Sequence, residues 1–181
     1  PVVDDRVVSL ARSGDRFDVT TAEGRSYSAN TVVLAVGRER RMLGLEHEMD
    51  WIGRGVSLCS TCDAPLHRGN VVAVVGGGNA AVEGASLLSR YARQVYIIYR
   101  RESFQRPEPV ILRRLNEAEN LLQVMGTNVV QLKGTGGLSG IVLDRPYEGS
   151  VDLEVDGLFV EIGADPRVDL ARQLGAELND Q

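Results

Sequence analysis

The chain has 181 residues, of which 43% are hydrophobic and 25% charged, and its formal net charge is −5 at pH 7. This composition is typical of a globular protein with a real core. The acidic balance argues against a broad nucleic-acid surface, because phosphate binding needs a basic face. No apolar run approaches the roughly 18–20 residues of a membrane helix. Two cysteines are too few for a secreted disulfide scaffold, so a reducing compartment such as the cytoplasm is expected.

The first part of the chain is predicted to form two or three antiparallel strands followed by a connector. Residues 16–20 and 26–36 alternate or run apolar, and Glu23-Gly24 lies between them, which predicts a turn at 22–25. Residues 37–58 contain four glycines and show no clear period, which indicates a connector.

A strand–helix–strand unit follows. Residues 71–75 (VVAVV) are typical of a buried strand. Small and apolar residues at helical spacing predict a helix over 78–92, and residues 94–99 are predicted to form a second strand. Such a crossover is right-handed and implies a parallel sheet with covered faces. The remaining predicted elements are a helix over 110–119 opened by Pro107 and Pro109, strands near 121–125, 127–132, 139–144, 151–155 and 157–162, and a weakly helical tail over 167–178.

The turn between the first of these strands and its helix carries a nucleotide-binding pattern. Its residues Gly76, Gly77, Gly78, Asn79, Ala80 and Ala81 fit G-x-G-x-x-A. The first glycine permits the tight turn, the next lets a pyrophosphate approach the backbone, and the last small residue lets the helix pack on the strand. The helix start offers free N–H groups and a positive dipole end to phosphate. The alternative is a glycine-rich turn without a ligand, as found in any doubly wound sheet.

The end of the second strand indicates which nucleotide is bound. NAD sites place an acidic residue there on the ribose 2′-hydroxyl, whereas this chain has Arg100 and Arg101, with Arg106 soon after. Guanidinium groups suit a 2′-phosphate because they remain charged and bind it in a fork, which predicts NADPH. Glu102 could reduce this preference, and a solvated arginine pair at a strand end is the alternative.

Cys59 and Cys62 form a Cys-x-x-Cys pair, which can be a redox disulfide, half a zinc site or two inert thiols. The chain has only two histidines, His47 and His67, and neither matches a common zinc-finger spacing, so no metal site is predicted. A helix N-terminus would lower the thiol pKa. Asp63 could move a proton as a thiolate forms or leaves, although a solvated acid in a first helical turn would look the same.

Together these motifs resemble the low-molecular-weight thioredoxin reductases. C-S-T-C-D-A at 59–64, G-G-G-N-A-A-V-E-G-A at 76–85 and Y-R-R-E-S-F-Q-R at 99–106 are similar to that family's C-A-T-C-D-G, G-G-G-[DN]-[ST]-A-V-E-E-A and H-R-R-x-x-F-R. A-V-G at 35–37 and G-L-F-V-E-I-G-A-D-P at 157–166 are similar to A-T-G and G-[VL]-F-V-x-I-G-H-x-P. The resemblance spans nearly the whole chain in the right order.

The resemblance implies an α/β, Rossmann-like FAD/NAD(P)-binding fold with a parallel sheet, helices and a covering β-meander, flanked by strands of an incomplete FAD domain. It implies FAD-domain strands and a first hinge over 1–40, an NADPH-binding domain over 41–157, and a second hinge with the start of the returning FAD segment over 158–181. The family's flavin fingerprints have no counterpart here, so we expect a piece of a longer reductase that is inactive by itself.

The resemblance also implies an electron path from NADPH to FAD, to the Cys59–Cys62 disulfide and to thioredoxin or a thioredoxin-like protein. Cys62 would face the flavin, Cys59 would attack the partner disulfide, and Asp63 would be the acid/base. A homodimer is expected for the full-length protein, without nucleic-acid or membrane partners. The expected cofactor-binding residues are Gly76, Gly77, Gly78, Asn79, Ala80, Ala81, Glu83, Arg100, Arg101, Arg106, Ile162 and Gly163.

Several positions depart from the family pattern. Tyr99 replaces a histidine, Gln105 an arginine, Ala80 a hydroxyl residue, Gly84 a second glutamate and Ala64 a glycine. The first four changes affect the expected NADPH affinity more than the expected fold, whereas Ala64 implies a different loop if that position needs a positive φ. Two alternatives stay open: a related disulfide oxidoreductase that uses a peroxidase partner, ferredoxin or oxygen, and a non-catalytic nucleotide-binding module.

Overall fold

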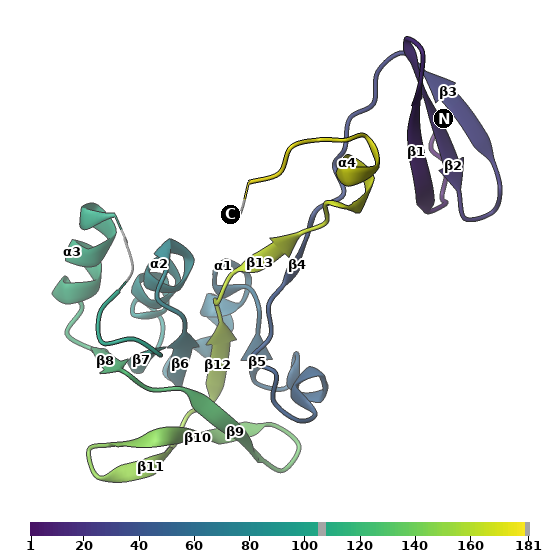
Figure 1. The fold of residues 1–181 in the computed structure, drawn as a ribbon. Coiled ribbons are helices and arrows are strands. Elements are labelled where there is room, and N and C mark those ends of the chain that lie inside the picture. The colour runs from purple at the N-terminus through teal and green to yellow at the C-terminus, as the bar shows by residue number, and fades with distance from the viewer. Residues whose placement is uncertain (105–107, 180–181) are drawn as a thin grey trace. The chain divides into compact units, whose positions relative to one another are not determined.

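The computed structural model describes residues 1–104 and 108–179, and of residues 111 and 114 the backbone only. The chain divides into two compact units, a central unit (Arg40–Ala164) and a flanking unit (Pro1–Glu39 and Asp165–Gln181). Figure 1 shows the elements of both.

The central unit is built on a five-stranded parallel sheet with the order β5-β12-β6-β7-β8. Its strands are β5 (Val56–Ser57), β12 (Gly157–Val160), β6 (Val71–Val75), β7 (Gln94–Tyr99) and β8 (Leu121–Met125). The predicted strands over 71–75, 94–99 and 121–125 are confirmed with these bounds. Nearly continuous burial along β6 and β12 shows that both faces of the sheet are covered, as a parallel sheet requires.

Helices cover one face of this sheet (Figure 1). They are α2 (Asn79–Leu88) and α3 (Pro109–Glu117), and the short α1 (Ser60–Asp63) continues into a 3-10 turn, η2 (Ala64–His67). The helix-side core joins Val72, Val74 and Ile97 of the sheet to Val82 and Leu88 of α2, all with essentially no exposed surface. Burying large aliphatic side chains in this way is the main source of the unit's stability.

An antiparallel meander covers the opposite face. It consists of β9 (Val129–Gly134), β10 (Leu138–Tyr147) and β11 (Ser150–Leu153) in the order β11-β10-β9. Ile141 and Leu143 of β10 share a second core cluster with Leu158 of the parallel sheet. The predicted α/β fold with a parallel sheet, helices and a covering meander is therefore confirmed.

The flanking unit contains a three-stranded antiparallel sheet, β1 (Val7–Ser13), β2 (Arg16–Thr21) and β3 (Ser26–Ala29). Helix α4 (Asp169–Gln173) packs beside β1, where the Gln173 side-chain oxygen accepts a hydrogen bond from the Leu10 N–H at 2.8 Å. The predicted strand over 26–36 is wrong beyond Ala29. Ala29 pairs with Phe17, and β2 begins one residue earlier at Arg16, so the ladder ends there and Val33 is 85% exposed.

The connector expected over 37–58 holds more structure than its sequence indicates. β4 (Arg38–Arg40) pairs with β13 (Ala164–Pro166), and the boundary between the two units falls within this ribbon. The 3-10 helix η1 (Glu48–Trp51) is anchored by Glu48, whose buried carboxylate accepts hydrogen bonds from the N–H groups of residues 43, 44 and 45. A buried carboxylate with several backbone donors organises a loop that has no periodic pattern.

Two predicted boundaries moved. The helix expected over 78–92 ends at Leu88, because the carbonyls of Ser89 and Ala92 accept hydrogen bonds from the Asn120 side chain at 2.9 and 3.0 Å. The second hinge is expected to begin at residue 158, whereas the boundary between the two compact units lies at 164/165, because β12 belongs to the central sheet. Identifying the two units as nucleotide and flavin domains stays a prediction.

Candidate functional site

Most of the predicted site residues that the structure describes lie at one edge of the central sheet. All five strands are parallel, so their carboxyl ends lie along the same edge, which is where ligands bind in open α/β folds. In the order of the strands, the residues that follow them there are Cys59 after β5, Glu161 after β12, Gly76 after β6, Arg100 after β7 and Thr127 after β8.

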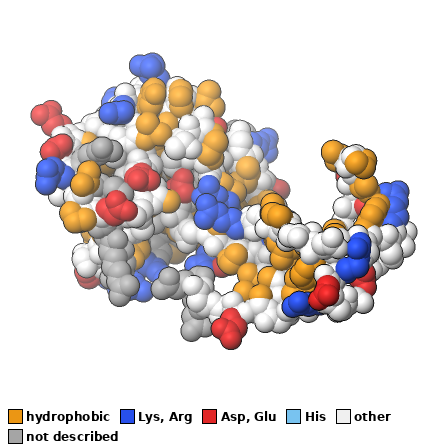
Figure 2. Space-filling view, turned by 90° about the horizontal axis from the view of Figure 1, so that it is seen from above, with side chains coloured by type: hydrophobic (Ala, Val, Ile, Leu, Met, Phe, Trp, Pro, Cys, Tyr) orange, Lys and Arg blue, Asp and Glu red, His pale blue; other side chains and the backbone are white. Residues whose placement is uncertain are grey.

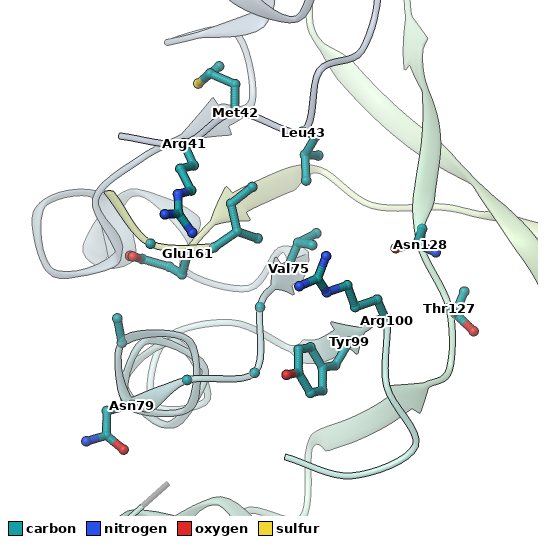
Figure 3. Close-up of a pocket in the computed structure, with 16 residues that line it drawn as sticks. Arg41, Met42, Leu43, Val75, Asn79, Tyr99, Arg100, Thr127, Asn128 and Glu161 are labelled. Carbon is teal, nitrogen blue, oxygen red and sulfur yellow. The ribbon is translucent and has the colours of Figure 1, made fainter. Parts of the chain in front are cut away.

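A cavity of about 570 Å³ opens at this edge (Figure 3). The glycine turn forms one part of it, together with the predicted residues Arg100, Ile162 and Gly163, and two segments that sequence reasoning did not assign to a ligand, 41–43 and 127–128, complete it. The lining comprises 41–43, 75–80, 99–100, 127–128 and 161–163. The volume lies within the range of small-molecule and cofactor sites.

Gly76 is a position that only glycine can occupy. Its φ of 145° is disfavoured for other residues, and a β-carbon there would overlap the carbonyl oxygen of Glu161 and lie 2.8 Å from the β-carbon of Ala81. Ala81 is itself fully buried, so the small residue brings helix α2 close to the strand. The turn is therefore tightly packed on its inner side.

Gly78 is the open position of the turn. It is exposed, and within the described residues a β-carbon there would meet no atom within 4 Å. It stands just before helix α2, whose first N–H groups have no intrahelical partner. An anion at this place would be favoured by these donors and by the helix dipole, and the described residues therefore fit a dinucleotide phosphate group.

The three predicted arginines have different places. Arg100 lines the cavity, whereas Arg101 is exposed outside its lining, and Arg106 lies outside the described residues. Glu102 pairs with Arg145 at 3.8 Å. A further cation, Arg41, comes from the segment after β4, and Figure 3 shows the side chains of Arg41 and Arg100 reaching the cavity from different sides. The sequence contained no signal for Arg41, because strand pairing alone brings it here.

Of the other predicted cofactor-binding residues, most line the cavity and one lies outside it. Asn79, Ala80, Ile162 and Gly163 line the cavity, as do Gly76, Gly77 and Gly78. Glu83 is exposed on α2 outside the lining.

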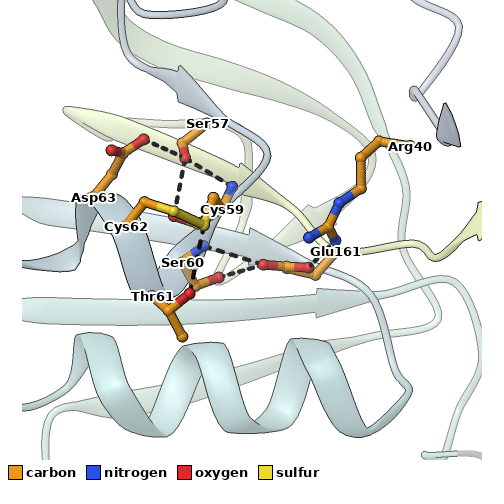
Figure 4. The surroundings of a disulfide bond; sticks show 8 residues. All are labelled: Arg40, Ser57, Cys59, Ser60, Thr61, Cys62, Asp63 and Glu161. Atoms are coloured by element: carbon orange, nitrogen blue, oxygen red, sulfur yellow. Dashed lines mark hydrogen bonds and ion pairs between the residues drawn. A yellow bond between two sulfur atoms is a disulfide. The ribbon is translucent and has the colours of Figure 1, made fainter. Parts of the chain in front are cut away.

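Cys59 and Cys62 are joined by a disulfide bond (Figure 4). Cys59 is the residue before helix α1, so the pair has the predicted place at a helix N-terminus. Cys62 is exposed and Cys59 half-buried. Within residues 1–104 and 108–179, no three His, Cys, Asp or Glu side chains gather as a metal site.

Asp63 is connected to the cysteines through a serine. Its Oδ2 accepts a hydrogen bond from the Ser57 hydroxyl at 2.7 Å, and that hydroxyl oxygen accepts one from the Cys59 N–H at 3.1 Å. Asp63 is half-buried, so its carboxylate is held beside the disulfide turn and is not a freely solvated acid. The geometry is compatible with proton transfer at the thiols.

Glu161 is another residue that sequence reasoning missed. It occupies a variable position of the family pattern, yet it is buried and accepts hydrogen bonds from Ser60 next to the disulfide. Its other carboxylate oxygen pairs with Arg40 at 3.1 Å (Figure 4). An acidic residue after a buried strand was the only available signal.

The surface carries mixed charge. On the face shown in Figure 2, Lys and Arg side chains are interspersed with Asp and Glu, in keeping with the net charge of −5. In the part of the chain that the structure describes, every helix is too short or too polar to cross a membrane.

Comparison with known proteins supports one assignment. The family model described as "Pyridine nucleotide-disulphide oxidoreductase" matches residues 2–181. A thioredoxin reductase of Streptomyces coelicolor is 36% identical over 170 residues, which are 93% of this chain and 52% of that protein. A bifunctional thioredoxin reductase/thioredoxin of Mycobacterium leprae is 38% identical over 165 residues, covering 91% of this chain and 36% of that protein.

Solved structures agree with this. The crystal structure of Lactococcus lactis thioredoxin reductase aligns with a TM-score of 0.81 at 27% identity, covering 94% of this chain and 56% of that one. The chain thus spans about half the length of such relatives, or less. With the glycine turn and the disulfide at one sheet edge, and a family match over nearly its whole length, the chain belongs to the pyridine nucleotide-disulphide oxidoreductase family.

Proposed function

We propose that this chain is the NADPH-binding, disulfide-carrying portion of a thioredoxin reductase-type flavoprotein. The observation that carries the proposal is the shared sheet edge. The disulfide follows β5 and the glycine turn follows β6, with only β12 between these strands. A unit with this arrangement carries both the binding site of the electron donor, NADPH, and the disulfide that passes the electrons on.

NADPH is the nucleotide that the cavity favours. The open backbone at Gly78 and the start of α2 would hold the pyrophosphate, and Arg100 would meet the 2′-phosphate. The nicotinamide supplies a hydride when the nucleotide is bound. Arg106 keeps its predicted role in phosphate binding as a hypothesis.

The disulfide is proposed to exchange with thioredoxin or a thioredoxin-like protein. In the reduced chain, the Cys59 thiolate attacks one sulfur of the partner disulfide and forms a mixed disulfide. The Cys62 thiolate then attacks Cys59, which restores the Cys59–Cys62 bond and leaves the partner as a dithiol. Two electrons pass in this exchange. Asp63 would take up or return the proton of a thiol, a role supported by its connection through Ser57 to the Cys59 N–H.

A two-electron relay is needed between nicotinamide and disulfide, and family membership implies a flavin for that role. The described residues of the flanking unit form antiparallel strands and a short helix, without a strand–glycine turn–helix crossover that would hold a dinucleotide. We therefore assign the flavin to no residue described here. The names of the relatives support thioredoxin as partner, and a homodimer in the reducing cytoplasm completes the proposal.

The exchange can be tested without a flavin. The chain is reduced with dithiothreitol, freed of reductant and mixed with oxidised thioredoxin, and alkylation followed by mass spectrometry counts the thiols on both proteins. We expect thioredoxin to gain two thiols as the chain loses two. Failure of exchange, with an oxidised peroxidase partner accepting the electrons instead, would favour the related disulfide oxidoreductases.

The roles of the two cysteines need a separate experiment, because Cys62 is the more exposed of the pair. The variants Cys62→Ser and Cys59→Ser are each mixed with a single-cysteine thioredoxin activated by thionitrobenzoate, whose release reports the attack. If Cys59 is the attacking thiol, Cys62→Ser reacts faster than Cys59→Ser. The opposite order would transfer the attacking role to Cys62.

A further inference from the structure

A buried carboxylate stands between the disulfide and the nucleotide cavity. Glu161 follows β12, the strand between β5 and β6, and its side chain is only 6% exposed. Its backbone oxygen packs on Gly76, and the residue lines the cavity. Glu161 therefore touches both halves of the proposed electron path.

The carboxylate holds the disulfide turn directly. One oxygen, Oε1, accepts hydrogen bonds from the Ser60 hydroxyl at 2.6 Å and from the Ser60 N–H at 3.2 Å. Ser60 is the first residue of α1 and lies next to Cys59 (Figure 4). Two donors on one carboxylate oxygen fix the position of this turn relative to the sheet.

Arg40 forms an ion pair with the other carboxylate oxygen. The other oxygen, Oε2, pairs with Nη1 of Arg40 at 3.1 Å, and the Arg40 side chain is 39% exposed. Buried charges interact strongly because water screens them little. The net field at the disulfide therefore depends on whether both members of this pair are present.

Helix α2 has a glycine, Gly84, where it meets Ser60. A β-carbon at Gly84 would lie 2.5 Å from the Ser60 hydroxyl oxygen and 2.9 Å from the Ser60 β-carbon. Gly84 is one of the departures from the family pattern, and its missing side chain leaves room for Ser60. Ser60, Gly84 and Glu161 thus fit together as one unit.

We propose that Glu161 is a positioning residue for the redox disulfide, and that the Glu161–Arg40 pair sets its reduction potential. The inference rests on the proposed function of Cys59 and Cys62. Reduction opens the disulfide to thiols that can ionise, and a nearby negative charge disfavours the thiolate while a positive charge favours it. The two members of the pair therefore act on the potential in opposite directions.

Two substitutions separate their effects. Glu161→Gln keeps an oxygen that can accept from Ser60 but removes the negative charge, so the reduced form is stabilised and the potential rises. Arg40→Met removes the positive charge that pairs with the carboxylate, so the reduced form is destabilised and the potential falls. Loss of packing alone would not give opposite signs.

The potential is measured by equilibrating the chain with glutathione buffers, followed by acid trapping and mass spectrometry. Each disulfide takes two electrons from two glutathione thiols and yields a dithiol and one oxidised glutathione. We expect each variant to shift the exchange constant by about threefold in its own direction, which is about 14 mV for a two-electron couple. Glu154→Gln and Arg93→Met, at exposed positions of the same unit, are the matched controls and should leave the constant unchanged.

Opposite shifts for Glu161→Gln and Arg40→Met, with silent controls, support the inference. Shifts of the same sign, or none, would overturn it even where the wild-type chain exchanges normally with thioredoxin. Conversely, opposite shifts in a chain that fails to exchange with thioredoxin would leave the inference standing and remove the proposed partner. The two failures are therefore distinguishable.

Discussion

The ring of Tyr99 lies directly on Gly77, so closely that a β-carbon at residue 77 would overlap three carbons of the ring. Tyr99 also stacks on Phe104, with ring centroids 6.0 Å apart and planes 17° from parallel. A side chain at residue 77 would therefore have to displace the outer end of an aromatic side chain from the neighbouring strand. In the family pattern that strand position is a histidine, and here the tyrosine ring lies against the turn.

Gly77→Ala is expected to weaken NADPH binding by about tenfold, or about 1.4 kcal/mol, because the new methyl group must displace Tyr99 and with it the phosphate turn. Titration of NADPH into the chain, followed by nucleotide fluorescence, measures the loss. Gly137→Ala is the control, since a β-carbon there would come no nearer than 3.8 Å to its closest contact. Unchanged affinity in Gly77→Ala would show that the turn does not depend on this packing.

Arg100 is expected to give the preference for NADPH over NADH. A charged hydrogen-bond contact is worth about 1.5–3 kcal/mol, so Arg100→Ala should reduce the NADPH affinity by roughly tenfold to a hundredfold and leave NADH nearly unaffected. Calorimetric titration of both nucleotides tests this. Arg101→Ala serves as the comparison because that side chain lies outside the cavity lining. Equal affinities of the wild-type chain for the two nucleotides would contradict the role.

Ser60 and Gly84 are expected to be energetically coupled. Gly84→Ala should gain up to about 1 kcal/mol of helix propensity but lose about 1–3 kcal/mol by crowding Ser60, and so destabilise the wild-type chain. In a Ser60→Gly background the crowding disappears and the same substitution should be neutral or stabilising. Urea unfolding of all four proteins gives the coupling free energy. Equal effects of Gly84→Ala in both backgrounds would disprove the contact.

His67 is expected to make the stability of the central unit depend on pH. Burial lowers its pKa below the ordinary 6.5, and the opposing influence of Asp63 and Asp156 is weaker. The unfolded chain then binds more protons than the folded chain between the two pKa values. The His67 contribution is therefore fully present above about pH 6.5 and is lost as the pH falls toward the folded pKa.

Urea unfolding followed by the fluorescence of Trp51, at about pH 7.5 and about pH 5.5, measures this loss. His67→Leu should reduce the difference between the two pH values. His47→Asn is the control, because His47 is 73% exposed and its left-handed backbone suits asparagine. The pKa values of Asp5 and Asp144 are lowered from the ordinary 3.8, so these two groups change the stability only at pH values below the range of this experiment. An unchanged pH dependence in His67→Leu would assign the effect to other groups.

The chain is expected to bind NADPH without oxidising it when thioredoxin is added and flavin is not. A hydride is not expected to reduce the disulfide without a two-electron relay. Absorbance of NADPH over time, with and without thioredoxin, is the measurement. Steady oxidation that requires Cys59 and Cys62 would show that the chain needs no flavin, and would overturn this part of the proposal.

The sequence by itself determined the parallel core and its turn. Buried strands over 71–75 and 94–99, and the glycines between strand and helix, are local patterns whose physical demands allow few alternatives, because a tight turn and a buried run each restrict the residue types. The redox pair could also be recognised, since two cysteines three apart can close on each other without help from distant segments.

Tertiary structure decided the rest, because it depends on which distant segments meet. Pairing of β4 with β13 brings Arg41 to the cavity, and the place of β12 between β5 and β6 brings Glu161 to Ser60, a residue 101 positions away. Val33 lies in an apolar run that was predicted to be a strand but is exposed in the structure. An apolar run becomes a strand only where a partner strand supplies hydrogen bonds. Contacts between distant segments produce no periodic pattern in a single sequence. The surroundings of these residues can therefore be known only from the fold.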